Sequence, residues 1–168
     1  MAVMSIRTLG DPVLRRETKA VERFDDALRR LADDMFETMY AAPGVGLAAN
    51  QVGLSLACFV YDDQDDHRGF VANPRLSAMK GSEERDEGCL SIPGPFHPTQ
   101  RASALRLRGQ GLDGSPMDVR AEGLLARIFQ HEADHLRGML YIDRLDDAGR
   151  RDVMRQLREL ELKRAQEA

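Results

Sequence analysis

Residues 130–136, Gln-His-Glu-Ala-Asp-His-Leu, decide how the rest of this chain has to be arranged. His131 and His135 are four positions apart, so on a helix both imidazoles lie on one face and can reach one metal ion. Glu132 lies beside that ion but is not turned toward it as a ligand, and a carboxylate in this place can exchange protons with a metal-bound water. A tetrahedral catalytic metal needs a third protein ligand and one open position. The remaining sequence therefore has to supply that third ligand.

A central helix is predicted over residues 123–137. Two adjacent stripes of it carry the apolar residues together with His131, His135 and Glu132. The opposite stripe is polar and is predicted to face solvent: Arg127, Gln130, Asp134 and Arg137. An unpaired charge is costly in an apolar interior, so histidines and a glutamate on the inward side indicate function.

Several side chains are candidates for the third ligand: Cys89, His97, His67, Cys58 and a number of acids. Cys89 is favoured because glycine and proline fix its surroundings and a thiolate binds transition metals strongly. His97, between prolines, is the competitor, although it also suits a plain surface loop. Zinc endopeptidases usually take their third ligand after the helix, and no histidine follows His135.

The first half of the chain alternates helix, turn and strand signals. Residues 1–24 predict an irregular arm, and a helix begins near Asp25-Asp26 and stops at Pro43-Gly44. Residues 44–53 are rich in small side chains. They suit either a flexible turn, which composition favours, or a backbone segment on which a ligand packs closely. The apolar run 54–61 predicts a buried strand.

The second half adds further strands and a last helix. The acidic run 62–67 is interpreted as a solvated loop rather than a cation site. A short strand is predicted over 70–74, ended by proline, and an exposed strand or loop over 75–86. Alternating residues on both sides of an Asp113-Gly114 turn predict a β-hairpin. A final helix is expected over about 147–164.

Composition limits the class of protein. The 168 residues, 42% of them hydrophobic, suit one folded domain, residues 1–168, with residues 147–168 as a C-terminal helix. The net charge of −4 predicts no bulk attraction to nucleic acid and no specific nucleic-acid partner. Two cysteines are too few for a disulfide framework. The opening residues lack the apolar core of a signal peptide, and no run approaches the ~20 apolar residues of a membrane span. We expect a soluble, cytoplasmic protein that does not enter a membrane.

Three motifs of the chain resemble those of peptide deformylases, in the same order. They are residues 44–51 (Gly-Val-Gly-Leu-Ala-Ala-Asn-Gln), 87–91 (Glu-Gly-Cys-Leu-Ser) and 130–136. Residues 10–14 also resemble the family's opening, and the likeness covers about residues 5–145. A histidine–glutamate motif alone is a weak signal, but three motifs in register are specific.

The resemblance implies roles for individual residues. Cys89, His131 and His135 would bind the metal, with water in the fourth position. Glu132 would take a proton from that water and later deliver one to the leaving amine. The side-chain amide of Gln51 and the backbone N–H of Leu90 would stabilise the developing oxyanion.

The implied reaction is hydrolysis of the N-formyl group from formyl-methionine at the start of new polypeptides, with formate as the other product. Gly46 and Gly88 would lie against the substrate, and an apolar pocket would take the methionine side chain. Val45, Leu125 and Ile128 are candidates for the pocket wall. The resemblance favours Fe(II) as the ion, with nickel, cobalt or zinc as substitutes, because a Cys-His-His site suits several metals.

The sequence departs from many relatives at Phe96, where they often carry an arginine near the substrate entrance. Arg101 could pair with Glu87 to brace the cysteine segment, or the two could form a simple surface ion pair. The last helix carries six Lys or Arg against four Asp or Glu from Gly149 onward. It is either a docked amphipathic helix or a contact surface, and the resemblance suggests ribosome contact.

Two other functions compete with the deformylase hypothesis. A zinc endopeptidase would also carry the histidine–glutamate motif, but the missing downstream ligand argues against it. A binding module without activity would not need Glu132 and Gln51 beside three ligands. We expect an α+β fold, with mixed, mostly antiparallel strands around the 123–137 helix and helices at both ends.

Overall fold

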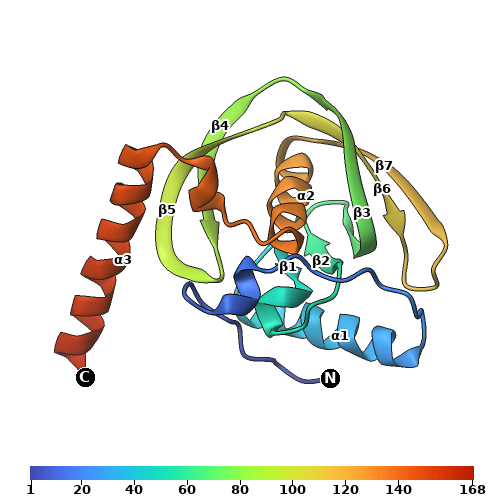
Figure 1. The fold of residues 1–168 in the computed structure, drawn as a ribbon, viewed down its shortest axis with the longest axis horizontal. Coiled ribbons are helices and arrows are strands. Elements are labelled where there is room, and N and C mark those ends of the chain that lie inside the picture. Colours follow the sequence, from blue (N-terminus) through green and yellow to red (C-terminus); the bar gives the residue numbers. More distant parts are fainter.

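Two antiparallel sheets wrap around one buried helix, α2 (Gly123–Leu136), in a computed structural model that describes residues 1–168 (Figure 1). The first sheet has the strand order β1-β2-β3-β6-β7. Its strands are β1 (Gly46–Ala48), β2 (Cys58–Asp62), β3 (Arg68–Lys80), β6 (Ala104–Gln110) and β7 (Pro116–Glu122). The second sheet pairs β4 (Glu83–Cys89) with β5 (Ile92–Arg101). The predicted α+β fold around the central helix is confirmed.

Helix α1 (Asp26–Ala41) begins and ends where the sequence predicts. The Asp25 carboxylate accepts a hydrogen bond of 3.1 Å from the backbone N–H of Leu28, which caps the first turn. Met35 and Met39 are fully buried against β1 and β2. The helix therefore supports the sheet edge at which the chain next enters the interior.

Residues 44–53 form ordered, buried structure, so the flexible-turn interpretation is wrong. The segment contains β1 and a short 3-10 helix, Ala49–Val52, and Gly53 ends that helix at a φ of +90°. Asn50 and Gln51 are almost completely buried. Close packing of this backbone, the alternative interpretation, agrees with the structure.

Strand β3 does not stop at Pro74, contrary to the prediction. The pairing of β3 with β6 shifts register between Ala72 and Arg75, which forms a bulge at the proline. A proline is tolerated there because no ladder hydrogen bond is required of it. Asn73 adopts a φ of +51°, and its side chain bonds both backbone groups of Val21 at 2.8 and 3.0 Å. The strand therefore bends and continues over the helix.

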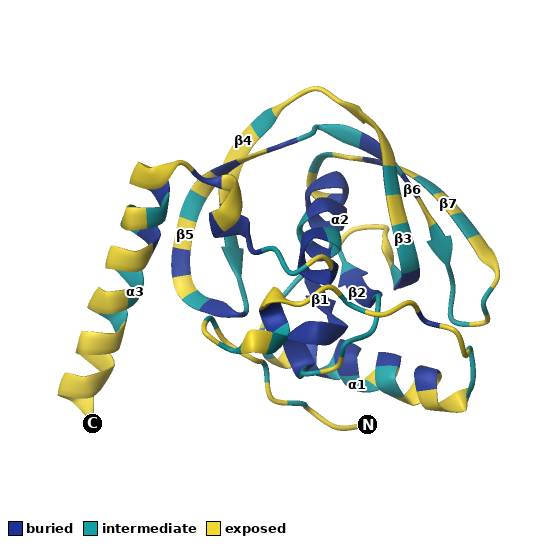
Figure 2. Ribbon diagram, in the orientation of Figure 1, coloured by how far each residue is buried: buried dark blue, intermediate teal, exposed yellow.

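The polar stripe of α2 is buried, and the prediction that it faces solvent is wrong for three of its four residues. Arg127, Gln130 and Asp134 are at most 8% exposed, and only Arg137 is exposed. Helix α2 is coloured as buried over most of its length in Figure 2. Strands β3, β4 and β5 arch over this side of the helix (Figure 1). These strands carry partner groups for the buried polar residues, which sequence periodicity does not reveal.

The strand predicted over 54–61 begins only at Cys58, as β2, because residues 54–57 form hydrogen bonds with the preceding turn and with Lys19. The last elements of the chain agree with the sequence. Strands β6 and β7 form the predicted hairpin, and helix α3 (Asp147–Glu167) lies against β5. Val153 of α3 is buried with the short 3-10 helix Tyr141–Arg144. The last turns of α3 project away from the body and are exposed (Figures 1 and 2). A third 3-10 helix, Pro12–Arg15, interrupts the N-terminal arm. None of the helices combines the length and apolar character that a membrane crossing requires.

Candidate metal centre

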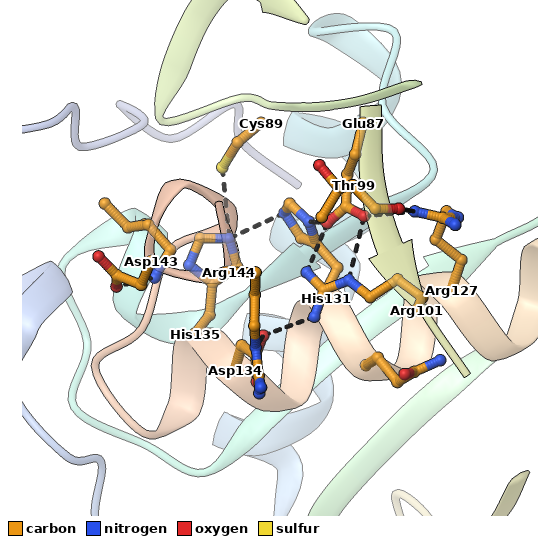
Figure 3. Close-up of polar contacts among 12 residues, drawn as sticks. Glu87, Cys89, Thr99, Arg101, Arg127, His131, Asp134, His135, Asp143 and Arg144 are labelled. Carbon is orange, nitrogen blue, oxygen red and sulfur yellow. Dashed lines mark hydrogen bonds and ion pairs between the residues drawn. The ribbon is translucent and has the colours of Figure 1, made fainter. Parts of the chain in front are cut away.

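Three donor atoms converge where the end of β4 meets α2. The Sγ atom of Cys89 lies 3.3 Å from Nε2 of His135, and the two histidine Nε2 atoms are 3.1 Å apart (Figure 3). Ligand atoms of all three residues lie within 4.8 Å of one another. Atoms bound to one ion at 2.0–2.3 Å are separated by similar distances, so the cluster has the size of a single-metal site.

The chemistry of the donor set also fits a transition metal. One thiolate and two imidazoles are ligands that zinc and iron accept. Nδ1 of His131 lies 2.6 Å from the Glu87 carboxylate, which orients the ring with Nε2 toward the other donors (Figure 3). Such a carboxylate behind a ligand histidine is a common feature of metal sites.

The other candidate ligands lie elsewhere. His97 sits on β5 facing α3, with Nε2 3.8 Å from the Asp152 carboxylate. His67 is exposed and contacts Asp63 in the loop after β2. Cys58 is buried among apolar residues, and burial raises the pKa of its thiol to about 12. Only Cys89 of the alternatives weighed from the sequence joins the two histidines.

Glu132 is buried beside the cluster. Its Oε2 atom has no hydrogen-bond partner in the protein, and burial raises the pKa of the carboxyl group to about 7. Gly46 of β1 faces it so closely that a Cβ atom there would lie 2.4 Å from Oε1. The glycine therefore leaves the space that this carboxylate occupies.

The side chain of Gln51 has a fixed orientation. Its Oε1 accepts a hydrogen bond of 2.9 Å from the backbone N–H of Ala48. Its Nε2 donates to Ser91 Oγ at 3.1 Å and lies 3.7 Å from Cys89 Sγ. The amide N–H groups are therefore directed toward the metal-ligand cluster. Leu90, directly after Cys89, lines the same space.

A cleft of about 540 Å³ opens onto this cluster. Its walls include Val45, Gly46, Gly88 and Ile128, all named from the sequence as substrate-binding candidates. Leu125, the fifth candidate, lies in the hydrophobic core instead, and Leu124 lines the cleft. The side of α2 that carries Leu125 packs against β2 and β3. Leu124, one position earlier on the helix, therefore lines the cleft in its place. A larger cavity, about 750 Å³, lies on the other side of α2 and contains none of the three ligands.

A buried ionic network holds the ligand elements together, and sequence reasoning found only part of it. Arg101 donates to Glu87 at 2.5 and 3.1 Å and to Asp134 at 2.7 Å (Figure 3). Arg127 donates to Glu87 at 2.8 Å, and Arg144 donates to Asp134 at 2.7 Å.

The predicted Arg101–Glu87 pair exists, and the surface alternative is wrong because the two side chains are 3% and 5% exposed. Burial alone would raise the pKa of Glu87, but hydrogen bonds from His131 and Arg101 hold it well below its usual range. Arg127 and Asp134 were missed because their spacing on the helix suggested a solvated face. Their partners, Glu87 for Arg127 and Arg101 and Arg144 for Asp134, lie far away in the sequence or beyond the helix, so no local signal indicated the pairing.

A buried Cys-His-His cluster with an adjacent carboxylate, at the base of a cleft wide enough for a peptide, defines the site of a metal-dependent hydrolase. The family model for polypeptide deformylase matches residues 3–151. A peptide deformylase of Syntrophobacter fumaroxidans is 47% identical over 169 residues, which cover 98% of this chain and 99% of that protein. One of Acidothermus cellulolyticus is 49% identical, over 96% of this chain and 89% of that protein.

Solved structures agree with the sequence relatives. A peptide deformylase of Legionella pneumophila superposes with a TM-score of 0.92 at 39% identity, covering 98% of both chains. That of Thermus thermophilus gives 0.88 at 42% identity, covering 99% of both. The chain belongs to the polypeptide deformylase family. It is therefore a metal-dependent enzyme that removes the N-formyl group from the formyl-methionine of newly made polypeptides and releases formate.

Proposed function

We propose that Cys89, His131 and His135 hold the metal ion on which deformylation depends. The single observation that carries this proposal is the convergence of their three donor atoms within 4.8 Å at the base of the cleft. A bound ion supplies Lewis acidity, which polarises a carbonyl and, in the best-studied zinc case, lowers the pKa of water to about 7. Glu87 acts behind His131 by keeping its Nε2 directed at the ion.

Glu132 is the proposed general base and acid. It accepts the proton of the attacking water and then delivers a proton to the amine that leaves. Support comes from its burial beside the ligands and from the raised pKa of about 7, because a group titrating near the working pH both takes and gives protons. Its Oε2 atom has no protein partner and is therefore free for the water.

Gln51 and Leu90 are the proposed oxyanion donors. The Gln51 amide is held by Ala48 and Ser91, so its N–H groups need no reorganisation when negative charge develops on the formyl oxygen. The Leu90 backbone N–H follows directly after the cysteine ligand. One preorganised donor of this kind contributes about 2.7–4 kcal/mol to lowering the barrier.

The substrate is proposed to lie along β1. This strand is the edge of its sheet, so its outer side can pair with an extended peptide, apart from the Ala48 N–H, which donates to Gln51. Gly46 and Gly88 line the cleft, and Val45 and Ile128 offer apolar surface for the methionine side chain. Leu124 takes the place expected of Leu125.

Fe(II) is the proposed ion, with zinc, nickel or cobalt as substitutes. Support comes from the mixed thiolate and imidazole donors, which several divalent metals accept. Anaerobic purification followed by elemental analysis tests the assignment. Iron at close to one ion per chain is expected, and a Cys89→Ala protein should lose most of it. Stoichiometric zinc with no iron under anaerobic conditions would overturn the choice of ion.

Formate release from formyl-Met-Ala tests the reaction itself. Turnover of this peptide is expected, with no cleavage of an internal peptide bond in a blocked control peptide. Cleavage of only the internal bond would instead support an endopeptidase. Residues 1–168 are proposed to act as one catalytic domain in the cytoplasm, where formylated chains are made.

We also propose ribosome contact through the exposed end of α3. Support comes from Arg158, Lys163 and Arg164, which are exposed and form no ion pair within the protein. Deleting residues 150–168 would remove the buried Val153, so charge reversal of the three basic residues to glutamate is the cleaner test. The variant should lose co-sedimentation with ribosomes while it keeps formate release from a free dipeptide.

The matched control for this test reverses Arg30, Arg75 and Arg120, three exposed arginines on other elements. Both triple variants change the net charge equally. Equal loss of co-sedimentation in the two would show bulk electrostatics and would contradict a specific contact through α3.

A further inference from the structure

Two large apolar side chains are exposed at the mouth of the cleft. Phe96 of β5 is 61% exposed and Leu124 of α2 is 45% exposed, and both line the cleft. The half-buried Pro93 and the buried Pro95 also belong to the wall of the cleft. Exposed apolar residues that occur singly need no explanation, but two large exposed apolar side chains in the wall of one binding cleft mark a surface that a ligand covers.

The Phe96 ring lies close to the reaction centre. It packs against Gly88, where an added Cβ atom would lie 2.6 Å from ring Cε1. Gly88 directly precedes the ligand Cys89, and consecutive Cα atoms are about 3.8 Å apart. An extended peptide advances about 3.3 Å per residue. A substrate with its formyl group at the cluster therefore passes this ring with the first residues after methionine.

The backbone at Phe96 is held by α3 and not by the neighbouring strand alone. Glu87 pairs with His97 and Cys89 pairs with Ile92, so Gly88 alone faces residues 93–96. Gln156 of α3 compensates for this irregularity. Its Oε1 accepts from the Phe96 N–H at 3.3 Å, and its Nε2 donates to the Phe96 carbonyl at 3.0 Å. The Gln156 side-chain amide thus provides the acceptor and the donor that a neighbouring strand would otherwise provide.

A second contact fixes the same segment against the helix. Gly94 adopts a φ of +110°, and a Cβ atom there would lie 2.3 Å from Leu160 Cδ1. The irregular part of β5 therefore rests on α3 at two points one turn apart, Gln156 and Leu160. The position of the Phe96 ring depends on the position of this helix.

We propose that Phe96 is a specificity-determining residue that contacts an apolar side chain in the first two positions after methionine, and that Gln156 is the residue that positions it. Covering the exposed ring removes apolar surface from water, which favours apolar over charged side chains at these positions. The proposal rests on the proposed use of the cleft by the formylated peptide. It adds a preference for nascent chains with particular side chains after the methionine.

The test measures kcat/KM for formyl-Met-Xaa-Ser and formyl-Met-Ser-Xaa peptides, with leucine, alanine, glutamate and lysine at Xaa. The wild-type protein should prefer leucine over alanine by about 3- to 10-fold at one or both positions, less than an enclosed pocket achieves. Phe96→Ala should reduce this ratio to about one. Phe96→Arg should reverse the order and favour glutamate, because the guanidinium pairs with a carboxylate.

Gln156→Ala tests the positioning role. It should lower the leucine-to-alanine ratio mainly through a higher KM for the leucine peptides, with kcat little changed. Arg151→Ala, at an exposed position on α3 that belongs to no proposed site, is the matched control and should behave as wild type. Melting temperatures of both variants separate positioning from folding, since general loosening of α3 would lower turnover of every peptide equally and leave the ratio intact.

Several outcomes would overturn the inference. The wild-type protein could show no preference for leucine, or the Phe96→Ala protein could keep that preference. The Gln156→Ala protein could also show the same proportional decrease of kcat/KM for every peptide. Failure of the proposed function is distinguishable, because the wild-type protein would then release no formate from any of these peptides.

Discussion

At the scale of single residues, Glu132 carries the chemistry that the chain itself supplies. Replacing it by glutamine keeps the shape and removes the proton transfer. Glu132→Gln is expected to lower kcat by about 10²- to 10⁴-fold, the usual contribution of a positioned acid or base. The measurement is formate release at saturating formyl-Met-Ala, with metal content determined on the same sample. Unchanged turnover in a protein that retains its metal would contradict the proton role.

The Glu132 carboxylate can occupy its position only because residue 46 is a glycine without a side chain. A Cβ atom at position 46 would lie 2.4 Å from Glu132 Oε1, so Gly46→Ala must displace either the carboxylate or β1. We expect a loss of kcat/KM of at least about 10²-fold, as misplacing a catalytic group by about 1 Å can cause. Gly111→Ala is the control, because its new Cβ would make only ordinary contacts of 3.5 Å or more. Equal activity of the two variants would show that the crowding has no consequence.

Individual ligand residues were predictable, but of the groups behind them only the Arg101–Glu87 pair was. Two histidines at helical spacing and a cysteine in a rigid segment carry recognisable chemistry in the sequence alone. The support that Asp134 and Arg127 give to the site depends on strands that cover α2. A polar stripe on a helix indicates a solvent-exposed surface only when no other element with charged side chains packs over it.

At the scale of elements, the β4–β5 hairpin is joined to α2 through Arg101, which contacts Glu87 on one element and Asp134 on the other. Arg101→Met should destabilise the protein by about 3 kcal/mol, the lower end for breaking a buried pair, because Arg127 and Arg144 still contact the two carboxylates. Urea unfolding followed by far-UV circular dichroism measures this free energy.

A surface pair provides the comparison for that variant. Arg106 contacts Asp118 between β6 and β7, with side chains 35% and 46% exposed. Arg106→Met removes the same number of charges and should cost about 0–1 kcal/mol. Equal destabilisation by the two changes would mean that the buried network contributes no more than a surface pair.

Elements with a clear period were predicted well, and the one that bends was not. Helix α1 has a capping aspartate and a regular core face, and the β6–β7 hairpin has strict alternation around a turn, so local sequence is sufficient for both. Strand β3 continues past Pro74 because a bulge and the distant Val21 backbone accommodate it. That contact is formed by tertiary structure, so local sequence could not predict it.

At the scale of the whole molecule, the catalytic helix is enclosed by ionic groups as well as by apolar ones. Glu87 and Asp134 lie on opposite sides of Arg101, and both are almost completely buried. Burial alone would raise the pKa of Asp134, but hydrogen bonds and charges from Arg144 and Arg101 lower it overall. The protein therefore depends on keeping these carboxylates ionised, and this makes its stability sensitive to acid.

The sign of that dependence follows from the direction of the shifts. A carboxyl group whose pKa is lower in the folded protein binds fewer protons there than in the unfolded chain. Its contribution to stability is complete above the unfolded pKa, near 4, and is lost as the pH falls from there through the folded value. The loss of these two carboxylates' contribution should therefore make the melting temperature fall steeply below about pH 4.

Asp134→Asn separates this network from general acid denaturation. The variant should be less stable than wild type at pH 7, and its melting temperature should fall less between pH 5 and pH 3, because one group with a lowered pKa is gone. Asp66→Asn, at an exposed aspartate without an ion pair, is the control and should run parallel to wild type. Differential scanning calorimetry of the three proteins across this range measures the effect. If the Asp134→Asn curve also runs parallel to wild type, the buried carboxylates do not control the response of the fold to acid.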